Sequence, residues 1–247
     1  MTVKDSFDVK GLATTWGVPT QKNNIATADA LSVRRLTEAG AVIFGKTNVP
    51  MWLADCQSFN SIYGRTQNPW NLDHSPGGSS GGSAAALAAG LTGLEMGSDI
   101  AGSIRNPAAF CGLYGHKPTM GICATQGHTL DKNLAPIDML VIGPLARSAG
   151  DLAIALKIIS GFDEIDSQGL RISLPRPRKK RLDEYKISII VDDETVPLAR
   201  EVCLLQERLA DFLKHTCVQV DIRARPDFDV AETHRVFDIL LRATTSG

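Results

Sequence analysis

The sequence lacks a net charge of either sign and lacks long apolar runs, and each absence excludes a class of protein. Lys and Arg total 26 against 27 Asp and Glu, so a net charge of -1 gives no general reason to expect a nucleic-acid partner. No apolar run approaches the ~20 residues that a membrane helix needs. Residues 1–11, MTVKDSFDVKG, have no apolar signal-peptide core. These absences predict a cytoplasmic protein that binds neither membrane nor nucleic acid.

Metal-binding patterns are also missing. The cysteines, at positions 56, 111, 123, 203 and 217, are odd in number and have no C-x-x-C spacing, which favours reduced thiols over disulfides or zinc. Cys111 and Cys123 lie among apolar or small residues and are expected to be buried. The five histidines are scattered, and no lysine follows the glycine-rich segments as a phosphate-binding loop requires. We therefore expect no metal and no cofactor.

Two segments rich in glycine and serine stand out from this background: GGSSGGS at 77–83 and GSDIAGS at 97–103. Glycine at such density is typical of sharp turns or close backbone approaches. The alanine-rich segment between them predicts a short helix from about Gly82, followed by a strand at 92–96. A further helix is expected to begin near Ser103, which would leave free backbone N–H groups beside that serine. Asp99 and Arg105 bracket Ser103, and we expect them to form an ion pair that fixes the loop.

The rest of the chain alternates between strand and helix patterns. A strand at 1–5, a helix at 27–39 and a buried strand at 41–45 form a βαβ unit with parallel strands. Residues 121–136 look irregular, and a helix begins at Ser148. Further on, apolar periodicity predicts strands at 186–193 and 217–223 and helices at 197–215 and 228–243. The fold class is therefore α/β.

A basic segment lies between these two regions, with its charges concentrated at Arg176–Arg181. A run of this kind is typical of a solvated connection, and no aromatic residues interleave with the charges as a nucleic-acid surface would need. We interpret it as a proline-stiffened connection.

The serines of the first glycine-rich segment also match a nucleophile motif. GGSSG fits the G-x-S-x-G elbow with Ser79 at its centre, and the same pattern recurs one residue on at Ser80. That elbow requires a hydrophobic strand immediately before it. The preceding residues, NPWNLDHSP, do not suit a central strand, so this interpretation fails.

Both glycine-rich segments resemble the defining region of the amidase signature family. GGSSGGSAAALAAG and GSDIAGSIRNPAAFCGLYGHKPT read almost as that region, and MTVKDSFDVKG is similar to the family's lysine-bearing strand. The resemblance implies a mixed central β-sheet covered by helices on both faces, incomplete in this chain. It is strong over 1–160, and we expect one domain over 1–247, with the catalytic core in 1–160 and a peripheral α/β part in 161–247.

The resemblance also implies roles for particular residues. Ser103 corresponds to the nucleophile, Ser79 to a bridging serine that follows a cis peptide bond, and Lys4 to the base. Substrate or oxyanion contacts fall to Ser80, Ile100, Ala101 and Gly102. Alanine at 101 replaces the family's usual glycine and would be strained if the position needs φ > 0. Lys46, the rival lysine, is not the base in the family, so we interpret it as structural.

The implied function is hydrolysis of a small-molecule carboxamide through an acyl-serine, by an enzyme that could form a homodimer. Two alternatives stay open. The chain could be a truncated, catalytically impaired remnant or a non-catalytic partner, because its lysine strand begins at Met1 and a terminal strand frays unless it is paired. It could instead be an amidotransferase subunit that releases ammonia from glutamine. We expect Lys4 to point to Ser79, and residues 1–5 to be the least protected strand of the sheet.

Overall fold

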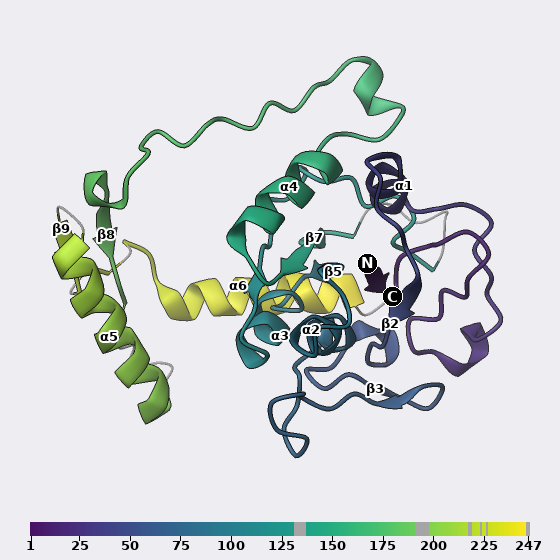
Figure 1. Cartoon of the computed structure of the whole chain (residues 1–247), viewed down its shortest axis with the longest axis horizontal. Coiled ribbons are helices and arrows are strands. Elements are labelled where there is room, and N and C mark those ends of the chain that lie inside the picture. Colours follow the sequence, from purple (N-terminus) through teal and green to yellow (C-terminus); the bar gives the residue numbers. More distant parts are fainter. Residues whose placement is uncertain (131–136, 191–197, 217–218, 223, 226, 246–247) are drawn as a thin grey trace. The chain divides into compact units, whose positions relative to one another are not determined.

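Figure 1 presents the computed structural model of the chain, which describes residues 1–130, 137–190, 198–216, 219–222, 224–225 and 227–245. The chain divides into two compact units, residues 1–172 and 173–247, and each is described by itself. The expectation that both belong to one domain stays a prediction.

The first unit is built on a five-stranded sheet with the strand order β2-β1-β5-β7-β6. Its strands are β1 (Thr2–Lys4), β2 (Gly45–Thr47), β5 (Leu94–Asp99), β6 (Tyr114–Gly115) and β7 (Val141–Ala146). β1 runs parallel to both β2 and β5, whereas β7 runs antiparallel to β5 and β6. The sheet is therefore mixed, and it begins with a parallel βαβ unit as predicted, although the second strand of that unit lies at 45–47 and not at 41–45.

Helices cover both faces of this sheet. They are α1 (Leu31–Glu38), α2 (Gly81–Ala88), α3 (Arg105–Phe110) and α4 (Ala149–Ile159), and a hairpin of β3 (Phe59–Asn60) and β4 (Gly64–Arg65) lies outside the sheet. On one face, Val3 and Met96 pack with Leu36 of α1 and Ile159 of α4. On the other face, side chains of α2 and α3 pack on Leu145 of β7. Figure 1 shows these helices around the sheet.

β1 lies inside the sheet and not at its edge. It pairs on one side with β2 and on the other with β5, and the side chains of Val3 and Lys4 are fully buried. A strand with both edges paired has its backbone donors and acceptors satisfied within the sheet. The structure therefore argues against the expectation that residues 1–5 form the least protected strand.

Two predicted elements lie elsewhere than expected. The buried strand predicted at 41–45 is wrong, because β2 begins only at Gly45 and the side chains of Val42 and Phe44 are 74% and 63% exposed. The helix predicted at 27–39 begins four residues late, at Leu31. Ala30 before it has an extended backbone, and its N–H donates to the Asp8 carbonyl. The apolar composition of these segments did not indicate where β2 or α1 begins.

Near the glycine-rich segments the element types are right and their limits shift. α2 begins at Gly81, β5 runs from Leu94 to Asp99 where 92–96 was expected, and α3 begins at Arg105, two residues after Ser103. The helix predicted from Ser148 is α4, which Ser148 caps by accepting the Asp151 N–H. Of the segment predicted to be irregular, residues 131–136 lie outside the described residues.

A buried polar cluster lies between the sheet and α2. Glu95 of β5 is fully buried, and its carboxyl accepts hydrogen bonds from the backbone N–H and the hydroxyl of Thr2. The Thr47 hydroxyl lies 3.5 Å from the same carboxyl and 2.7 Å from the Ser83 hydroxyl on α2. Burial raises the pKa of Glu95 to about 7, although these hydrogen bonds work in the opposite direction. Glu95 is thus held among neutral partners, with no basic side chain paired to it among the described residues.

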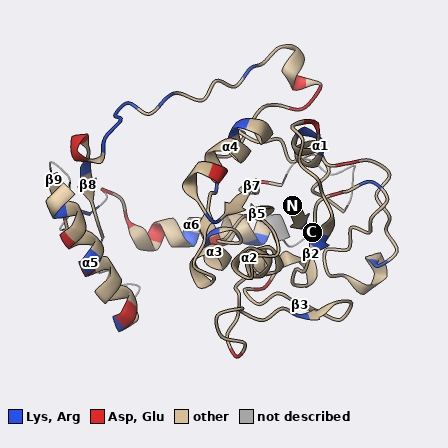
Figure 2. Cartoon of the chain, in the orientation of Figure 1, with Lys and Arg blue, Asp and Glu red and all other residues tan. Residues whose placement is uncertain are grey.

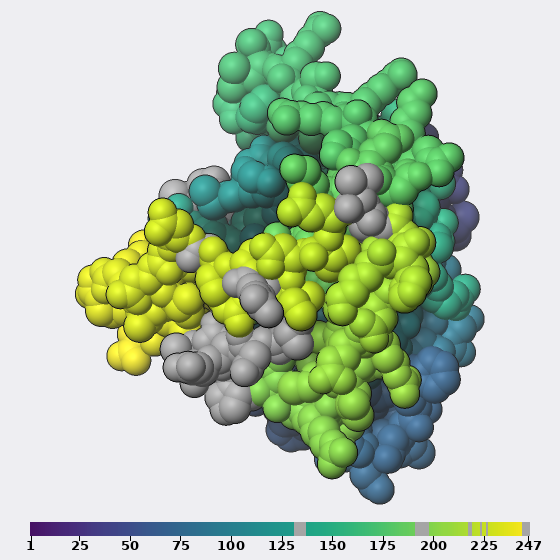
Figure 3. Space-filling view, turned by 90° about the vertical axis from the view of Figure 1, so that its left-hand side faces the viewer, coloured from purple at the N-terminus to yellow at the C-terminus, as the bar shows by residue number. Residues whose placement is uncertain are grey.

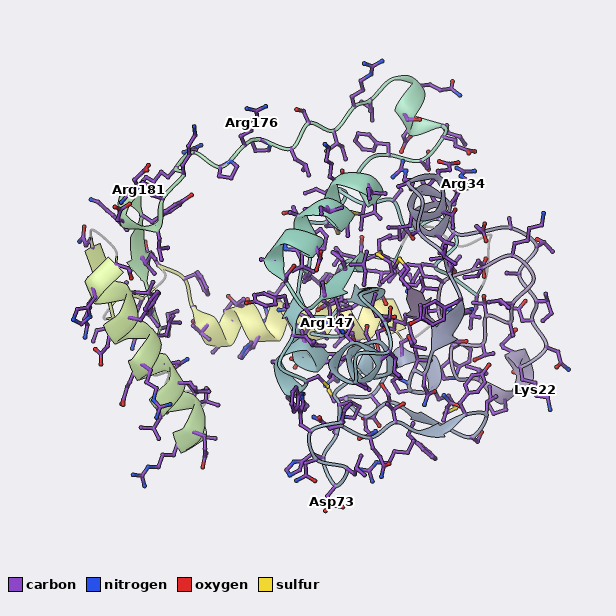
Figure 4. All side chains as sticks on the ribbon, viewed as in Figure 1. Lys22, Arg34, Asp73, Arg147, Arg176 and Arg181 are labelled. Carbon is purple, nitrogen blue, oxygen red and sulfur yellow. The ribbon has the colours of Figure 1, made fainter. Side chains whose placement is uncertain are left out.

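Arginines join helices and loops of the first unit to the sheet. Arg147, labelled in Figure 4, follows β7 and donates to the carbonyls of Leu87 and Thr92 at the end of α2. Arg34 of α1, also labelled, pairs with Glu164 at 2.5 Å. The first contact holds the end of α2 beside β7, and the second joins α1 to the loop that follows α4.

The second unit holds a small parallel sheet of β8 (Lys186–Ser188) and β9 (Gln219–Asp221), with α5 (Arg200–Thr216) and α6 (Val230–Thr245). Each overlaps a predicted element, and residues 191–193, 197, 217–218 and 223 of those predictions lie outside the described residues. α5 buries Ala210 and Leu213 but leaves Leu205 and Phe212 exposed, and it runs as a light-green band in Figure 3.

The basic segment at the start of this unit is extended and exposed. Figure 2 shows Lys and Arg in blue along it, and Figure 4 labels Arg176 and Arg181. Arg181 pairs with Asp183. Along the described parts of the whole chain, no helix is both long enough and apolar enough to cross a membrane.

Candidate active site

Lys4 and Ser79 meet at the end of β1, although 75 residues separate them in the chain. The Nζ atom of Lys4 lies 2.7 Å from the Ser79 hydroxyl, and both side chains are buried. Lys4 ends β1 and Ser79 lies just before α2, which packs on the same sheet face. The predicted contact between Lys4 and Ser79 is therefore confirmed.

The surroundings of Lys4 favour its neutral form. Burial lowers the pKa of Lys4 to about 7, and the nearby Asp99 carboxylate opposes this effect only in part. Asp5, its neighbour in the chain, turns its carboxylate away and accepts from the Thr15 N–H and hydroxyl and from the Trp16 N–H. A neutral amine within hydrogen-bond distance of a hydroxyl can accept that hydroxyl's proton.

The backbone before Ser79 closely approaches a neighbouring loop. The Gly78–Ser79 peptide bond is cis, as the resemblance implies. A Cβ on Gly78 would lie 2.3 Å from the Asp55 carbonyl oxygen, so no side chain fits at this position. Glycine here lets the segment pack against residues 55–56, beside the Ser79 that contacts Lys4.

Asp99 organises the loop that carries Ser103. Its carboxylate accepts from the N–H groups of Gly102 at 2.7 Å and Ile104 at 3.0 Å, and it forms an ion pair with the Arg105 guanidinium at 3.0 Å. Burial raises the pKa of Asp99, but these hydrogen bonds outweigh burial and hold the pKa below its usual value. The predicted role of Asp99 and Arg105 as an ion pair that fixes the loop is confirmed.

The candidate oxyanion donors differ in their availability. The Gly102 N–H already donates to Asp99. In contrast, the amides of Ala101 and Ser103 donate to no acceptor within the part of the chain that the structure describes. Gly102 has a φ of 108°, whereas the φ of Ala101 is not positive. The alanine at 101 therefore introduces no left-handed strain. Ile100 lies half-buried at the start of this loop.

Ser80 connects the two glycine-rich segments through its backbone. Its N–H donates to the Ser103 carbonyl at 3.2 Å, and its hydroxyl lies 3.5 Å from the Ser98 carbonyl. Ser80 is fully buried, so it holds the loops of Ser79 and Ser103 side by side. Among the described residues, no hydrogen bond joins the hydroxyl of Ser103 to that of Ser79. The structure thus contains the first predicted hydrogen bond of the relay, between Lys4 and Ser79. It also brings together the loops of Ser79 and Ser103, which the second hydrogen bond would join.

Lys46, the rival base, belongs to β2, which pairs with the edge of β1 that faces away from β5, and its environment is different. Its Nζ donates to the Ala13 carbonyl at 2.6 Å and the Thr14 hydroxyl at 3.0 Å, and it lies 3.9 Å from Asp5. Burial lowers the pKa of Lys46 to about 8, against the effect of Asp5. Lys46 also lines a cavity of about 420 Å³ beside β2, which none of the three predicted catalytic residues lines. No serine hydroxyl contacts it among the described residues, so Lys46 anchors the loop at 13–14, as predicted.

Two further polar side chains at this end of β1 were not singled out from the sequence. Ser98 of β5 contacts Lys4 through both its hydroxyl, at 3.0 Å, and its carbonyl, at 3.4 Å. His128 lies 2.9 Å from the Ser6 hydroxyl and packs edge-on to Phe7. Burial, and secondarily Lys4, lowers the pKa of His128 to about 3. Extending the predicted strand through residue 99 would have placed Ser98 beside β1, whereas no sequence signal marked His128.

Metal binding and catalysis by a cysteine nucleophile find no support among the described residues. Among the residues described, no group of three or more His, Cys, Asp or Glu side chains is placed to hold a metal ion. Cys111 and Cys123 are buried, as predicted, and burial raises the pKa of the Cys111 thiol to about 11. A buried thiol with a raised pKa is a poor nucleophile.

Comparison with known proteins finds relatives of this chain. The sequence model of the family described as Amidase matches residues 1–244. The chain is 39% identical over 190 residues to the glutamyl-tRNA(Gln) amidotransferase A-subunit of Sulfurisphaera tokodaii, covering 77% of this chain and 39% of the relative. The corresponding protein of a Nostoc species is 41% identical over 194 residues, with 76% and 39% covered. The chain thus spans about two fifths of the length of these relatives.

Solved structures give the same result for the fold. The crystal structure of the Thermotoga maritima glutamyl-tRNA(Gln) amidotransferase A-subunit matches with a TM-score of 0.85 and 29% identity, covering 99% of this chain and 53% of that one. A bacterial aryl acylamidase described as an amidase signature enzyme matches with a TM-score of 0.84 and 26% identity, covering 99% and 51%. The predicted fold, a mixed sheet between helices that is partial relative to these neighbours, is confirmed.

Proposed function

Because the chain belongs to the amidase family, we propose that it carries the catalytic residues of an enzyme that cleaves a carboxamide C–N bond through an acyl-serine. In this proposal Ser103 is the nucleophile, Ser79 relays its proton, and Lys4 is the base. The observation that carries the proposal is the buried Lys4 amine, 2.7 Å from the Ser79 hydroxyl with a pKa of about 7.

The proposed reaction begins with two coupled proton transfers. Ser79 gives its proton to the neutral Lys4 amine and takes the proton of Ser103, whose oxygen attacks the amide carbonyl. The amides of Ala101 and Ser103, which lack acceptors among the described residues, would donate to the oxyanion as it forms. The proton then returns to the leaving nitrogen, and water hydrolyses the acyl-serine.

The hydrogen bond between the Ser79 and Ser103 hydroxyls would have to form when substrate binds. Catalytic hydrogen bonds are often long or poorly aligned without ligand and shorten in the complex with substrate. The backbone contact of Ser80 with Ser103, at 3.2 Å, keeps the two loops adjacent, where this hydrogen bond would form.

A second candidate function is favoured by the names of the relatives. Two A-subunits of glutamyl-tRNA(Gln) amidotransferases are 39% and 41% identical to this chain. The same serines and lysine would then release ammonia from glutamine, and the chain would act with partner subunits. A catalytically impaired form is the third outcome that the experiment must distinguish.

A fluorophosphonate probe on the purified chain tests the nucleophile directly. We expect labelling of Ser103, located by peptide mass spectrometry, and loss of labelling in Ser103→Ala. The exposed Ser167→Ala serves as a matched control that keeps the label. Hydrolysis of glutamine and of a simple aryl amide is then compared, since preference for glutamine supports the amidotransferase function. No labelling of the wild-type chain supports the impaired form, and labelling that persists in Ser103→Ala overturns the assignment.

A further inference from the structure

Ser98 contacts the Lys4 amine through two separate oxygen atoms. The Nζ atom lies 3.0 Å from the Ser98 hydroxyl, 3.4 Å from the Ser98 carbonyl and 2.7 Å from the Ser79 hydroxyl. These are its only hydrogen-bond partners among the described residues. One residue therefore supplies two of the three contacts of the candidate base.

The bonding of a neutral amine determines where the lone pair of the Lys4 nitrogen lies in this arrangement. A neutral lysine has two N–H bonds and one lone pair around nitrogen, whereas an ammonium has three donors and no acceptor. The Ser98 carbonyl can only accept, so it takes one N–H, and the Ser98 hydroxyl can accept the second. The remaining position, the lone pair, then lies toward Ser79.

We propose that Ser98 is a positioning residue for Lys4: its hydroxyl and carbonyl accept the two N–H bonds of the neutral amine and so direct the lone pair at the Ser79 hydroxyl. This inference rests on the proposed function, in which Lys4 is the base. When the Ser79 O–H bond breaks, its proton forms the third N–H bond of Lys4, and the Ser79 oxygen takes the proton of Ser103. The ammonium then donates to the same three oxygens without moving.

Ser98 is held firmly enough for this task. It is 2% exposed, lies inside β5 and pairs with Ile142 of β7 in the sheet register. Its carbonyl also accepts from the Ser80 hydroxyl at 3.5 Å. A group on a sheet strand is fixed more precisely than one on a loop. Since both of its oxygens belong to one rigid residue, they hold the amine from a constant direction.

The other charged groups near Lys4 do not compete for its N–H bonds. Asp99 directs its carboxylate to the loop amides and to Arg105. His128, whose pKa burial lowers to about 3, is neutral in the working range. Lys46 and Asp5 contact the loop at 13–16. Among the described residues, the direct contacts of the amine are therefore those with the two serines.

Replacing Ser98 tests the proposal without relying on catalysis. Ser98→Ala removes an acceptor from the ammonium, where a hydrogen bond is stronger than in the neutral amine, so the pKa of Lys4 should fall by about 0.5–1 pH unit. The measurement is an NMR titration of the full chain with ¹³C-labelled lysine, in which the Lys4 signal is identified by its loss in Lys4→Met. Ser98→Thr keeps the hydroxyl and should restore the wild-type titration.

Ser83→Ala is the matched control, because Ser83 is also buried and hydrogen-bonded on this sheet face but contacts Thr47 and not Lys4. It should leave the Lys4 titration unchanged. An unchanged titration in Ser98→Ala, a Thr variant that behaves like the Ala variant, or an equal shift in Ser83→Ala would each overturn the inference.

Activity gives an independent second readout. In an active chain we expect Ser98→Ala to lower kcat on the order of tenfold to a hundredfold with little change in KM, since only the base is misdirected. The acid limb of its pH–rate profile should move to lower pH, in step with the NMR titration. If the wild-type chain has no amidase activity, the proposed function fails, while the titration still decides the role of Ser98.

Discussion

Replacing Glu95 by glutamine should stabilise the first unit at neutral pH. Glu95 is fully buried under α2, where Thr2, Thr47 and Ser83 supply hydrogen bonds but no positive charge. A neutral amide has nearly the same shape as the protonated carboxyl and can use the same hydroxyl partners. The variant therefore removes the cost of a buried charge without opening a cavity.

The magnitude follows from the raised pKa. Burial raises the pKa of Glu95 from 4.5 to about 7, and each pH unit is worth about 1.4 kcal/mol. Between these values the folded chain binds more protons than the unfolded chain, so the contribution of Glu95 to stability falls as pH rises from 4.5 and levels off above 7. The advantage of Glu95→Gln should grow from near zero at pH 4 to about 3 kcal/mol at pH 8.

Urea unfolding at several pH values measures this difference. The three tryptophans, at 16, 52 and 70, all lie in residues 1–172, so their fluorescence reports the first unit alone. The pKa of His128 is lowered, so His128 makes stability rise with pH below 6.5 in both proteins and cancels in the comparison. The exposed Glu38→Gln, which loses only a surface pair with Arg34, should change stability by less than about 0.5 kcal/mol. A constant difference between Glu95→Gln and wild type from pH 4 to 8 would refute the reasoning.

Further outcomes concern the two lysines and the sheet. Activity should rise with pH through about 7 as Lys4 loses its proton, and Lys4→Ala should lower kcat at least ~100-fold at every pH in a steady-state assay. Lys46→Ala should keep the activity but lower the free energy of unfolding by about 1–3 kcal/mol in urea, and an inactive but folded Lys46→Ala would contradict the choice of base. In hydrogen exchange, Val3 should exchange more slowly than Val42, because β1 is paired on both edges; the reverse order would mean that β1 frays.

The sequence was most informative where residue types are unusual. Glycine and serine at 77–83 and 97–103 marked the loops of Ser79 and Ser103, because few other structures need such dense small residues. The resemblance then tied Lys4 to Ser79, a contact across 75 residues that no local pattern contains. Local chemistry thus located the loops, and only family resemblance joined them to β1.

The failures have physical reasons of a different kind. β7 carries Gly143 and Pro144, residue types that favour turns, so no strand was predicted there although it pairs with both β5 and β6. The apolar segment with Val42 and Phe44 indicated a buried strand, but burial depends on which other segments pack against it. Glu95 illustrates the same limit, because a charged residue within a strand pattern gives no sign that three hydroxyls will surround it.

The position of β1 between β2 and β5 has a consequence for how the chain is made. The partners of β1 come later in the sequence, and its bond from Thr2 to Glu95 closes a separation of 93 residues. Contacts of such long range form late, because a long loop must close before they stabilise anything. On the ribosome, Lys4 would stay hydrated and protonated until β5 has been synthesised. The burial that lowers the pKa of Lys4 therefore arises only as the sheet is completed.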